Sequence, residues 1–136
     1  MEKRDWIIPA NPSVYDAVSA FRKLKTLDWH KSRMMRNMQV EDTAYIYISK
    51  SIKMIKFKCV VTKSEVHGLE IDDEIFYVDK SLATKDGEFI ELTMLCEYPD
   101  TESLSLERLR ENGIKGNIQC TQKILTSVSD YIESVL

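Results

Sequence analysis

The chain is poor in the residues from which common catalytic and metal-binding motifs are built. It contains only four glycines, and no glycine-rich phosphate-binding loop is present. Its three cysteines form no CxxC pair, and its two histidines, His30 and His67, lie at metal-ligand spacing neither from a cysteine nor from each other. We therefore expect a protein that works without a metal ion or another cofactor.

Catalytic chemistry is also weakly supported. Asp28, His30 and Ser32 are the residue types of a hydrolytic triad, but in an extended segment successive members would lie about 6.6 Å apart along the chain. That spacing exceeds the hydrogen-bonding reach that a proton relay needs. The four acids within 70–74 could hold a divalent ion, but such a run is more typical of a solvated turn. These patterns favour a non-enzymatic protein.

Long apolar runs are missing too, since none approaches the about 20 residues that a membrane-spanning helix needs. Residues 1–5 are rich in charge and lead directly into a strand-like stretch, which predicts that no signal peptide is present. The widely separated Cys59, Cys96 and Cys120 are typical of free thiols in a reducing compartment, so we expect a cytoplasmic protein. Cys59 and Cys96 fall on the apolar phases of expected strands, and both should be buried.

What the chain does contain is an ordinary globular composition, with 43% hydrophobic and 30% charged residues over 136 positions. Alternation with a period of two, together with turn residues, predicts strands at 5–9, 44–49, 53–66, 75–78, 89–98 and 118–124. Ala44, Ile46 and Ile48 should face one side of their strand, and the tyrosines between them the other. In the next strand, Ile55 should share a face with Phe57.

Helices are expected at three places. Asn11 as N-cap, with a proline after it, predicts a helix over 12–24. The segment 104–112 should form a second helix that Gly113 ends. Ser127, with an acid three residues later, resembles a capping box and predicts a final helix.

The connections between these elements are mostly short. Residues 50–52 should link two strands into a hairpin, and Asp86-Gly87 is a turn signal before the strand at 89–98. The chain therefore predicts a single α+β domain over 1–136. It should have five to six strands in a curved antiparallel sheet or small barrel, flanked by two to three helices.

Charge is divided unevenly along the chain. Residues 22–63 carry eleven Lys and Arg against three acids, a net charge of +8, although the whole chain carries −3 and the remainder therefore −11. Aromatic residues lie within this basic segment, which is typical of a surface that binds a polyanion with stackable bases, such as DNA or RNA. A lysine-rich edge strand that resists aggregation would give the same pattern.

Short patterns along the chain point to one family. A Trp-led strand ends in an Asn-Pro corner over Trp6–Pro12, and Trp29 precedes a basic Arg36-Asn37 pair and the tyrosine-rich strand at 44–49. With these patterns the chain resembles the EVE domain, a member of the PUA-like superfamily related to the YTH domains. Residues 118–123 and the helix after them are similar to the family's closing strand and last helix.

The sequence departs from the family pattern at several positions. Glu41 stands where the family usually has glycine, the stretch around Trp29 is altered, and the proline of the closing strand is missing. These departures concern the chemistry of the pocket more than the fold.

The resemblance implies a pocket that takes a single nucleobase, often a modified one, flipped out of its strand. Such a base needs flat apolar faces to stack on and a few polar groups for its edge. We expect stacking walls and edge-reading groups among Trp29, Tyr47, Tyr45, Asn11, Ser32 and Ser49. We expect contacts to the flanking phosphates from Lys31, Arg33, Arg36, Lys56 and Lys58.

Each pocket residue also has a structural alternative. Trp29 could belong to the core, and Asn11 could serve as a helix cap rather than as a base reader. Tyr45 and Tyr47 share a face of their strand that could pack on the final helix. Trp6 is expected in the core.

The interpretation is a module that recognises a modified base in DNA or RNA, in restriction and defence or in RNA modification, alone or with an effector protein. Two other interpretations stay open. In one, the basic hairpin meets the acidic surface of a protein partner, so the chain is an adaptor. In the other, the pocket takes a free small heterocycle. Strong salt dependence of binding would favour nucleic acid over both.

Overall fold

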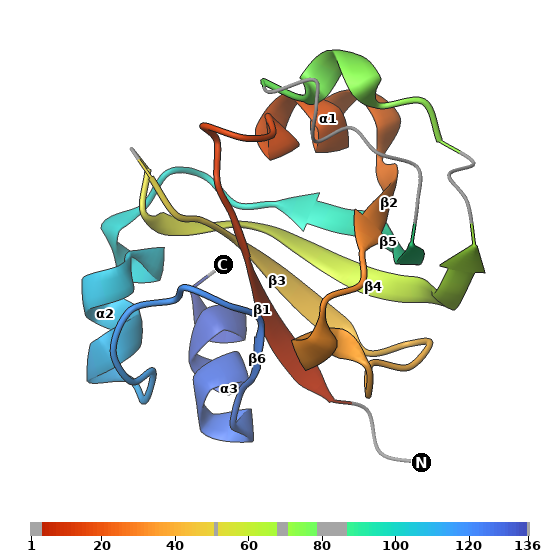
Figure 1. Cartoon of the computed structure of the whole chain (residues 1–136). Coiled ribbons are helices and arrows are strands. Elements are labelled where there is room, and N and C mark those ends of the chain that lie inside the picture. Colours follow the sequence, from red (N-terminus) through yellow and green to blue (C-terminus); the bar gives the residue numbers. More distant parts are fainter. Residues whose placement is uncertain (1–3, 51, 68–70, 79–86, 136) are drawn as a thin grey trace.

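Figure 1 shows the computed structural model of the chain, in which residues 4–50, 52–67, 71–78 and 87–135 are described. The strands are β1 (Asp5–Ala10), β2 (Thr26–His30), β3 (Thr43–Ile48), β4 (Met54–His67), β5 (Glu88–Glu97) and β6 (Gln122–Lys123). The α-helices are α1 (Ala17–Leu24), α2 (Leu106–Glu111) and α3 (Thr126–Ser134). Short 3-10 helices occur at η1 (Arg33–Met35), η2 (Glu74–Phe76) and η4 (Glu102–Leu104).

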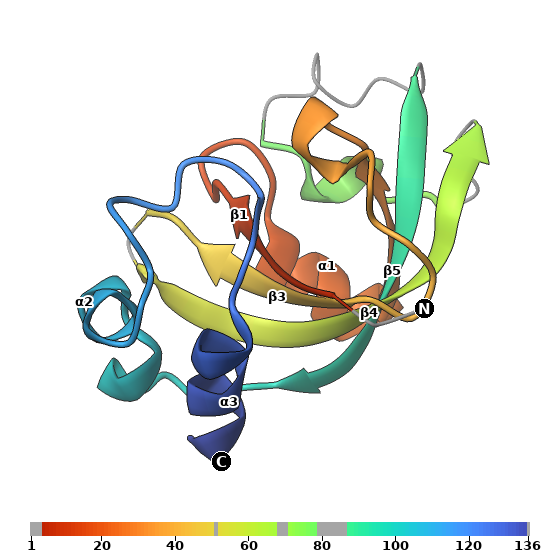
Figure 2. The ribbon, with the colours of Figure 1, turned by 90° about the horizontal axis from the view of Figure 1, so that it is seen from below.

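One mixed sheet contains these six strands in the order β2-β5-β4-β3-β1-β6. β1 runs parallel to β3, and the other neighbouring pairs are antiparallel. The parallel pair departs from the antiparallel sheet that the sequence predicts, and it arises because α1, β2 and η1 return the chain to the end at which β1 started. The sheet curves strongly (Figure 2), and the predicted α+β class is confirmed.

Both faces of the sheet are buried. α1 covers one face, where Phe21 joins a core with Phe57, and α2 and α3 cover the other, where Ile132 joins a second core. The alternation predicted for β3 is confirmed, because its aliphatic residues enter the first core and its tyrosines the second: Ala44, Ile46 and Ile48 against Tyr45 and Tyr47. A sheet covered on both sides leaves its binding sites to the strand ends and to the loops beyond them.

The alternation predicted for β4 is wrong at one position. Ile46 pairs with Phe57, but the next residue of β3, Tyr47, pairs with Ile55, so Lys56 is an extra residue in β4. This β-bulge reverses the faces on its N-terminal side, and Ile55 therefore lies in the second core rather than beside Phe57.

The first helix begins later than the sequence predicts. α1 starts at Ala17, and its cap is Asp16, whose side chain accepts a hydrogen bond from the Ser19 N–H at 3.1 Å. The Asn11 side chain instead accepts from the Ser13 N–H at 2.9 Å and forms a turn of its own. The intervening residues are held by the segment around η2, since the Asp16 N–H donates to the Phe76 carbonyl at 2.7 Å.

Two predicted strands are shortened or replaced. Residues 75–78 do not form a strand: η2 covers the first part, and Tyr77 makes an isolated bridge with Tyr15. Of the segment 118–124, only the two residues of β6 form a strand, which pairs with Trp6 and Ile7 of β1, and the Ile124 N–H donates to the Asp5 carbonyl at 2.9 Å.

The helix ends agree partly with the sequence. Gly113 follows α2 with a φ of 122°, as its predicted role as a stop requires. The capping box at Ser127 is wrong, because the N-cap of α3 lies two residues earlier, at Leu125, whose side chain cannot accept a hydrogen bond. Of the predicted turn at 86–87, the first residue lies outside the described residues.

Several core predictions concern single residues. Trp6 is buried, and its Nε1–H donates to Asp42 Oδ2 at 3.0 Å. Cys59 is fully buried, and burial raises the pKa of its thiol; Cys96 is half-buried and Cys120 is exposed. Within the part of the chain that the structure describes, none of the helices has the length and apolar character needed to cross a membrane.

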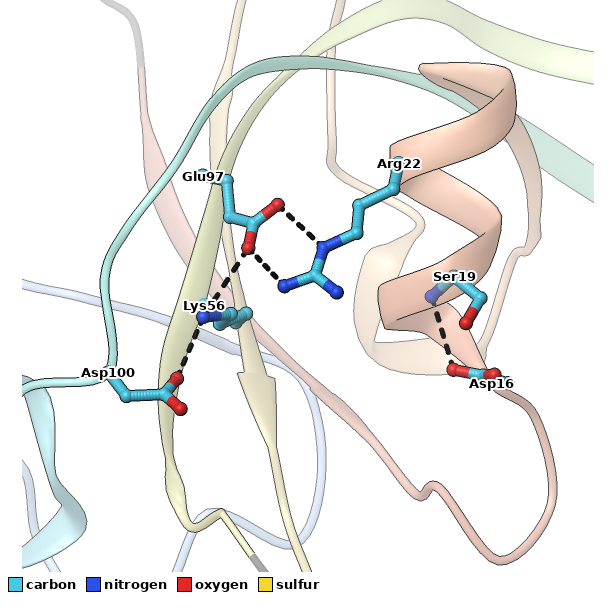
Figure 3. Close-up of polar contacts among 6 residues, drawn as sticks. All are labelled: Asp16, Ser19, Arg22, Lys56, Glu97 and Asp100. Carbon is cyan, nitrogen blue, oxygen red and sulfur yellow. Dashed lines mark hydrogen bonds and ion pairs between the residues drawn. The ribbon is translucent and has the colours of Figure 1, made fainter.

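A charged network fixes α1 to the end of the sheet (Figure 3). Arg22 of α1 donates from Nε and Nη2 to the two carboxylate oxygens of Glu97, at 2.9 and 2.6 Å. The bulged Lys56, only 5% exposed, places its ammonium group 3.4 Å from Glu97 and 2.7 Å from Asp100. The hydrogen bond from Arg22, with a further contribution from Lys56, holds the pKa of Glu97 below its ordinary value.

We expect Glu97→Gln to lower the free energy of unfolding more at pH 7 than at pH 3. A carboxyl group whose folded pKa is depressed stabilises the fold above its unfolded pKa, about 4.3, and loses that effect as the pH falls through the folded pKa. Chemical denaturation at both pH values measures the difference. The exposed Glu65→Gln is the control, and an equal loss at both pH values would contradict the assigned network.

Candidate functional site

A cavity of about 240 Å³ opens between the end of β1 and the edge strand β2. β6 pairs with β1 only at Trp6 and Ile7, and no other described strand pairs with this side of β1, so its second part can border a cavity. We call this cavity the aromatic pocket; its lining residues are Pro9, Ala10, Asn11, Val14, Tyr15, Asp28, Trp29, His30 and Tyr77.

Three aromatic rings give the pocket its walls. The Tyr15 ring lies edge-on to Trp29, with centroids 6.0 Å apart and planes at 87°, and Tyr77 lies 4.6 Å from Tyr15. Trp29 is half-buried and stacks on the core residue Phe21 at 6.0 Å and 16°. The two alternatives for Trp29 therefore coexist, because it packs against the core and also lines the pocket.

Two polar side chains that line the pocket are also fixed by hydrogen bonds. Asp28 is 5% exposed, and its Oδ2 accepts from the Ile71 N–H at 3.2 Å. The Asn11 carbonyl oxygen is engaged by Ser13, so the amide NH₂ is the group that this side chain can direct toward a ligand. The pocket thus offers a carboxylate as acceptor and an amide as donor beside its rings.

Tyr15 is held in place by a buried carboxylate. Its hydroxyl donates to Asp73 Oδ2 at 2.7 Å, and Asp73 is only 4% exposed. Burial raises the pKa of Asp73, and the bond from Tyr15 opposes that rise. Burial, together with the hydrogen bond to Asp73, also raises the pKa of Tyr15, so its hydroxyl remains a donor at neutral pH.

Tyr15 and Tyr77 are pocket residues that the sequence did not assign. Tyr77 reaches the pocket because the segment around η2 pairs with the residues before α1: the Val78 N–H donates to the Val14 carbonyl at 2.8 Å. For Tyr15 a signal was present, because it lies off the apolar phase of the predicted helix. For Tyr77 the pairing of distant segments gives no local signal.

A second cavity, of about 450 Å³, lies on the other side of the β1 end and is bordered by the β3–β4 hairpin. We call it the hairpin pocket; its lining residues are Pro9, Asn11, Tyr47, Ser49, Lys50, Lys53, Leu106, Asn117, Ile118 and Gln119. The residues expected in one base pocket are thus divided: Trp29 lines the aromatic pocket, Tyr47 and Ser49 line the hairpin pocket, and Asn11 borders both.

Tyr45 and Ser32 line neither of these pockets. Tyr45 is fully buried, and its hydroxyl donates to Glu133 of α3 at 2.7 Å, which matches the alternative of packing on the final helix. Ser32 is the residue before η1, and its backbone carbonyl accepts from the Met35 N–H at 2.9 Å.

Many basic residues of the segment 22–63 form ion pairs or hydrogen bonds within the molecule. Its ion pairs with acids of the C-terminal half involve Arg22, Lys56, Lys58 and Lys63. Among the expected phosphate ligands, Lys58 lies 2.5 Å from Glu133, and Lys31 donates to the Ser64 carbonyl at 3.0 Å. Arg33 and Arg36 are exposed at η1. The uneven charge along the sequence is therefore partly neutralised by folding.

No group of three or more potential metal ligands occurs among the described residues. Of the acidic run at 70–74, the first residue lies outside the described part, and Asp73 is buried against Tyr15 rather than solvated.

Solved structures share this fold. The human THYN1 protein, in complex with 5-methylcytosine-containing DNA, superposes with a TM-score of 0.65 over 98% of this chain and 97% of that chain, at 13% identity. The ASCH protein of Zymomonas mobilis gives a TM-score of 0.64 over 98% and 96%, at 11% identity. A hypothetical protein of Leishmania major gives 0.67 over 98% and 94%, at 19% identity. The chain has a PUA-like fold.

This PUA-like fold is the one that the EVE resemblance implies, and at these identities the likeness establishes the fold alone. No protein-family model and no curated protein matches the sequence significantly. The roles assigned to the pocket residues therefore follow from the geometry of this structure and not from a relative.

Tyr15→Phe should remove one donor from the buried Asp73 carboxylate while keeping the ring. We expect the free energy of unfolding at pH 7 to fall by about 1–3 kcal/mol, the cost of a buried group that loses its partner. The Asp73 pKa is raised in the fold, so its ionisation opposes folding as the pH rises; without Tyr15 the pKa should rise further. The loss should therefore be smaller at pH 4 than at pH 7.

Tyr131→Phe is the matched control for this measurement. The Tyr131 hydroxyl donates to the neutral Ser103 carbonyl at 2.6 Å, so its removal should have an effect that changes little with pH. Denaturant unfolding of both variants at pH 4 and pH 7 separates the two cases. If Tyr15→Phe showed no more pH dependence than Tyr131→Phe, the carboxylate would not be the relevant partner.

Proposed function

We propose that this PUA-like domain binds nucleic acid without catalysing a reaction on it, and takes one flipped-out, modified base into the aromatic pocket. The observation that carries the proposal is the meeting of Trp29, Tyr15 and Tyr77 with Asp28 and Asn11 in one cavity. Flat rings supply stacking area, and the two polar side chains supply partners for the edge of a base.

The rigidity of the wall favours base binding. Trp29 stacks on Phe21, and Tyr15 is fixed by Asp73, so neither ring has to be ordered when a ligand enters. Stacking of one base on an aromatic side chain contributes about 1–3 kcal/mol, which helps to offset the cost of removing the base from its strand.

The polar groups favour a base that presents both a donor and an acceptor. The Asp28 carboxylate accepts hydrogen bonds, as from the exocyclic amine of cytosine, and the Asn11 amide donates them. A base with an amino group beside a ring nitrogen or carbonyl satisfies both. The presence of 5-methylcytosine DNA in the THYN1 structure supports this choice by analogy of fold.

The surroundings of the pocket supply charge for the strand. Arg33 and Arg36 are exposed beyond the end of β2, the strand that carries Trp29, and are the strongest of the expected phosphate contacts. Lys31 lies between them and the pocket residue His30. Such contacts would position the strand without reading its sequence. We place the domain in restriction and defence or in RNA modification, with an effector protein as a further partner.

A binding panel tests the proposal directly. Single-stranded and double-stranded DNA and RNA oligonucleotides, with one unmodified, methylated or missing base, are titrated against the domain at several salt concentrations. We expect affinity to fall with salt and to fall again when the base is missing. Binding of a free nucleobase with little salt dependence would instead identify a small-heterocycle binder.

Trp29→Leu should lower the affinity for the preferred oligonucleotide by about 1–3 kcal/mol and abolish the difference between a modified base and a missing one. Trp6→Leu is the matched control, because Trp6 is buried away from the pocket. Both variants should unfold at lower temperature, since both lose packed ring area. Equal affinities of the two variants would count against the aromatic pocket as the base site.

A further inference from the structure

We propose that the hairpin pocket binds a backbone phosphate of the same strand, next to the base held in the aromatic pocket. This inference deepens the proposed function and rests on it. The pocket has a volume of about 450 Å³, which is ample for one phosphate group. None of the lysines or arginines that the sequence pattern predicts as phosphate ligands lines it.

The chemistry of the lining favours an anion rich in acceptors. Lys50 and Lys53 bring two ammonium groups, which only donate hydrogen bonds, and none of the described lining residues carries a carboxylate. Because a carboxylate would repel a phosphate and a lysine attracts it, this composition fits a phosphate rather than a cation.

The amide side chains of the pocket are oriented as donors. Asn11 uses its carbonyl oxygen to accept from the Ser13 N–H, and Asn117 uses its own to accept from Arg110 Nη2 at 2.6 Å. Each side chain is left with its NH₂ group for a ligand, and because this group carries two hydrogens, Asn11 can donate one to the base and one to the phosphate. The pocket therefore combines two ammonium groups with two fixed amide donors, which is the complement that phosphate oxygens require.

The fold holds these donors in place from both sides. The Ser49 N–H donates to the Ala10 carbonyl at 3.0 Å, which joins one end of the hairpin loop to β1. The Leu106 N–H donates to the Lys53 carbonyl at 3.1 Å, which joins the other end to α2. Lys53 itself has a φ of 51°, a left-handed conformation that these contacts maintain.

The two pockets share a wall, so a phosphate in one and a base in the other would lie close enough to belong to one strand. Pro9 and Asn11 line both cavities, so the end of β1 separates them by the width of one strand segment. A nucleotide that placed its base on the Trp29 side would have its backbone passing over this wall. An adjacent phosphate would then enter the hairpin pocket.

The test combines a protein variant with single-phosphate neutralisation. In the double variant K50Q/K53Q, we expect severalfold weaker binding of the preferred oligonucleotide and a salt slope smaller by about 0.7 for each phosphate that the protein no longer neutralises. Oligonucleotides with one methylphosphonate, placed in turn at each position around the base, locate the phosphate. One position should weaken binding to the parent protein and have no effect on K50Q/K53Q.

The control is Lys23→Gln, an exposed lysine of α1 on the opposite face of the sheet. Thermal unfolding confirms that each variant is folded. If K50Q/K53Q binds like Lys23→Gln, or if no methylphosphonate position depends on the two lysines, the phosphate site is wrong while base recognition stands. If K50Q/K53Q weakens binding but the removal of the base does not, the phosphate site stands and the aromatic pocket is not the base site. If the parent protein binds no oligonucleotide, both proposals are wrong.

Discussion

The parallel pairing of β1 with β3 is the constraint on which the rest of the structure depends. It runs the whole length of β1, from Asp5 opposite Thr43 to Ala10 opposite Ile48. β6 pairs only with the first part of the other side of β1, and no strand among the described residues pairs with the second part. Both pockets lie along this end of β1, and Pro9 and Asn11 belong to both. A change in this register would reverse the faces of β1 and dismantle the shared wall.

The basic residues of this molecule fall into two groups that the sequence does not distinguish: those that stabilise the fold and those that remain exposed. Some basic residues of the segment 22–63 hold the fold, as Lys56 does when it fills a β-bulge and bridges two carboxylates. Others, such as Arg33 and Arg36, remain exposed. A buried ammonium group such as that of Lys56 is tolerable only when it is paired. The acids that pair with this basic segment lie far along the chain, in β5, just after it and in α3.

Local signals were sufficient for some single elements, although not for the capping box expected at Ser127. The alternation of β3 predicted its two faces, and the α+β class and curved sheet followed from the number of such segments. Predictions were wrong where distant contacts decided the local structure. Asn11 has the sequence of a helix cap, yet the contact of Asp16 with Phe76 delays the helix, and one bulged residue moves Ile55 to the other core.

The sequence by itself determined the fold class and the buried position of Trp6. It named Trp29 and Asn11 as candidates for one pocket, but it did not decide between that role and a place in the core or at a helix cap. Only the tertiary structure decided that Tyr47 and Ser49 border a different cavity, that Tyr45 is bonded to α3, and that Tyr77 completes the aromatic walls. The physical reason is that alternation fixes the face on which a side chain lies. The partner that it meets there depends on which segments the folded chain brings together, and such pairing over many residues leaves no periodic signal.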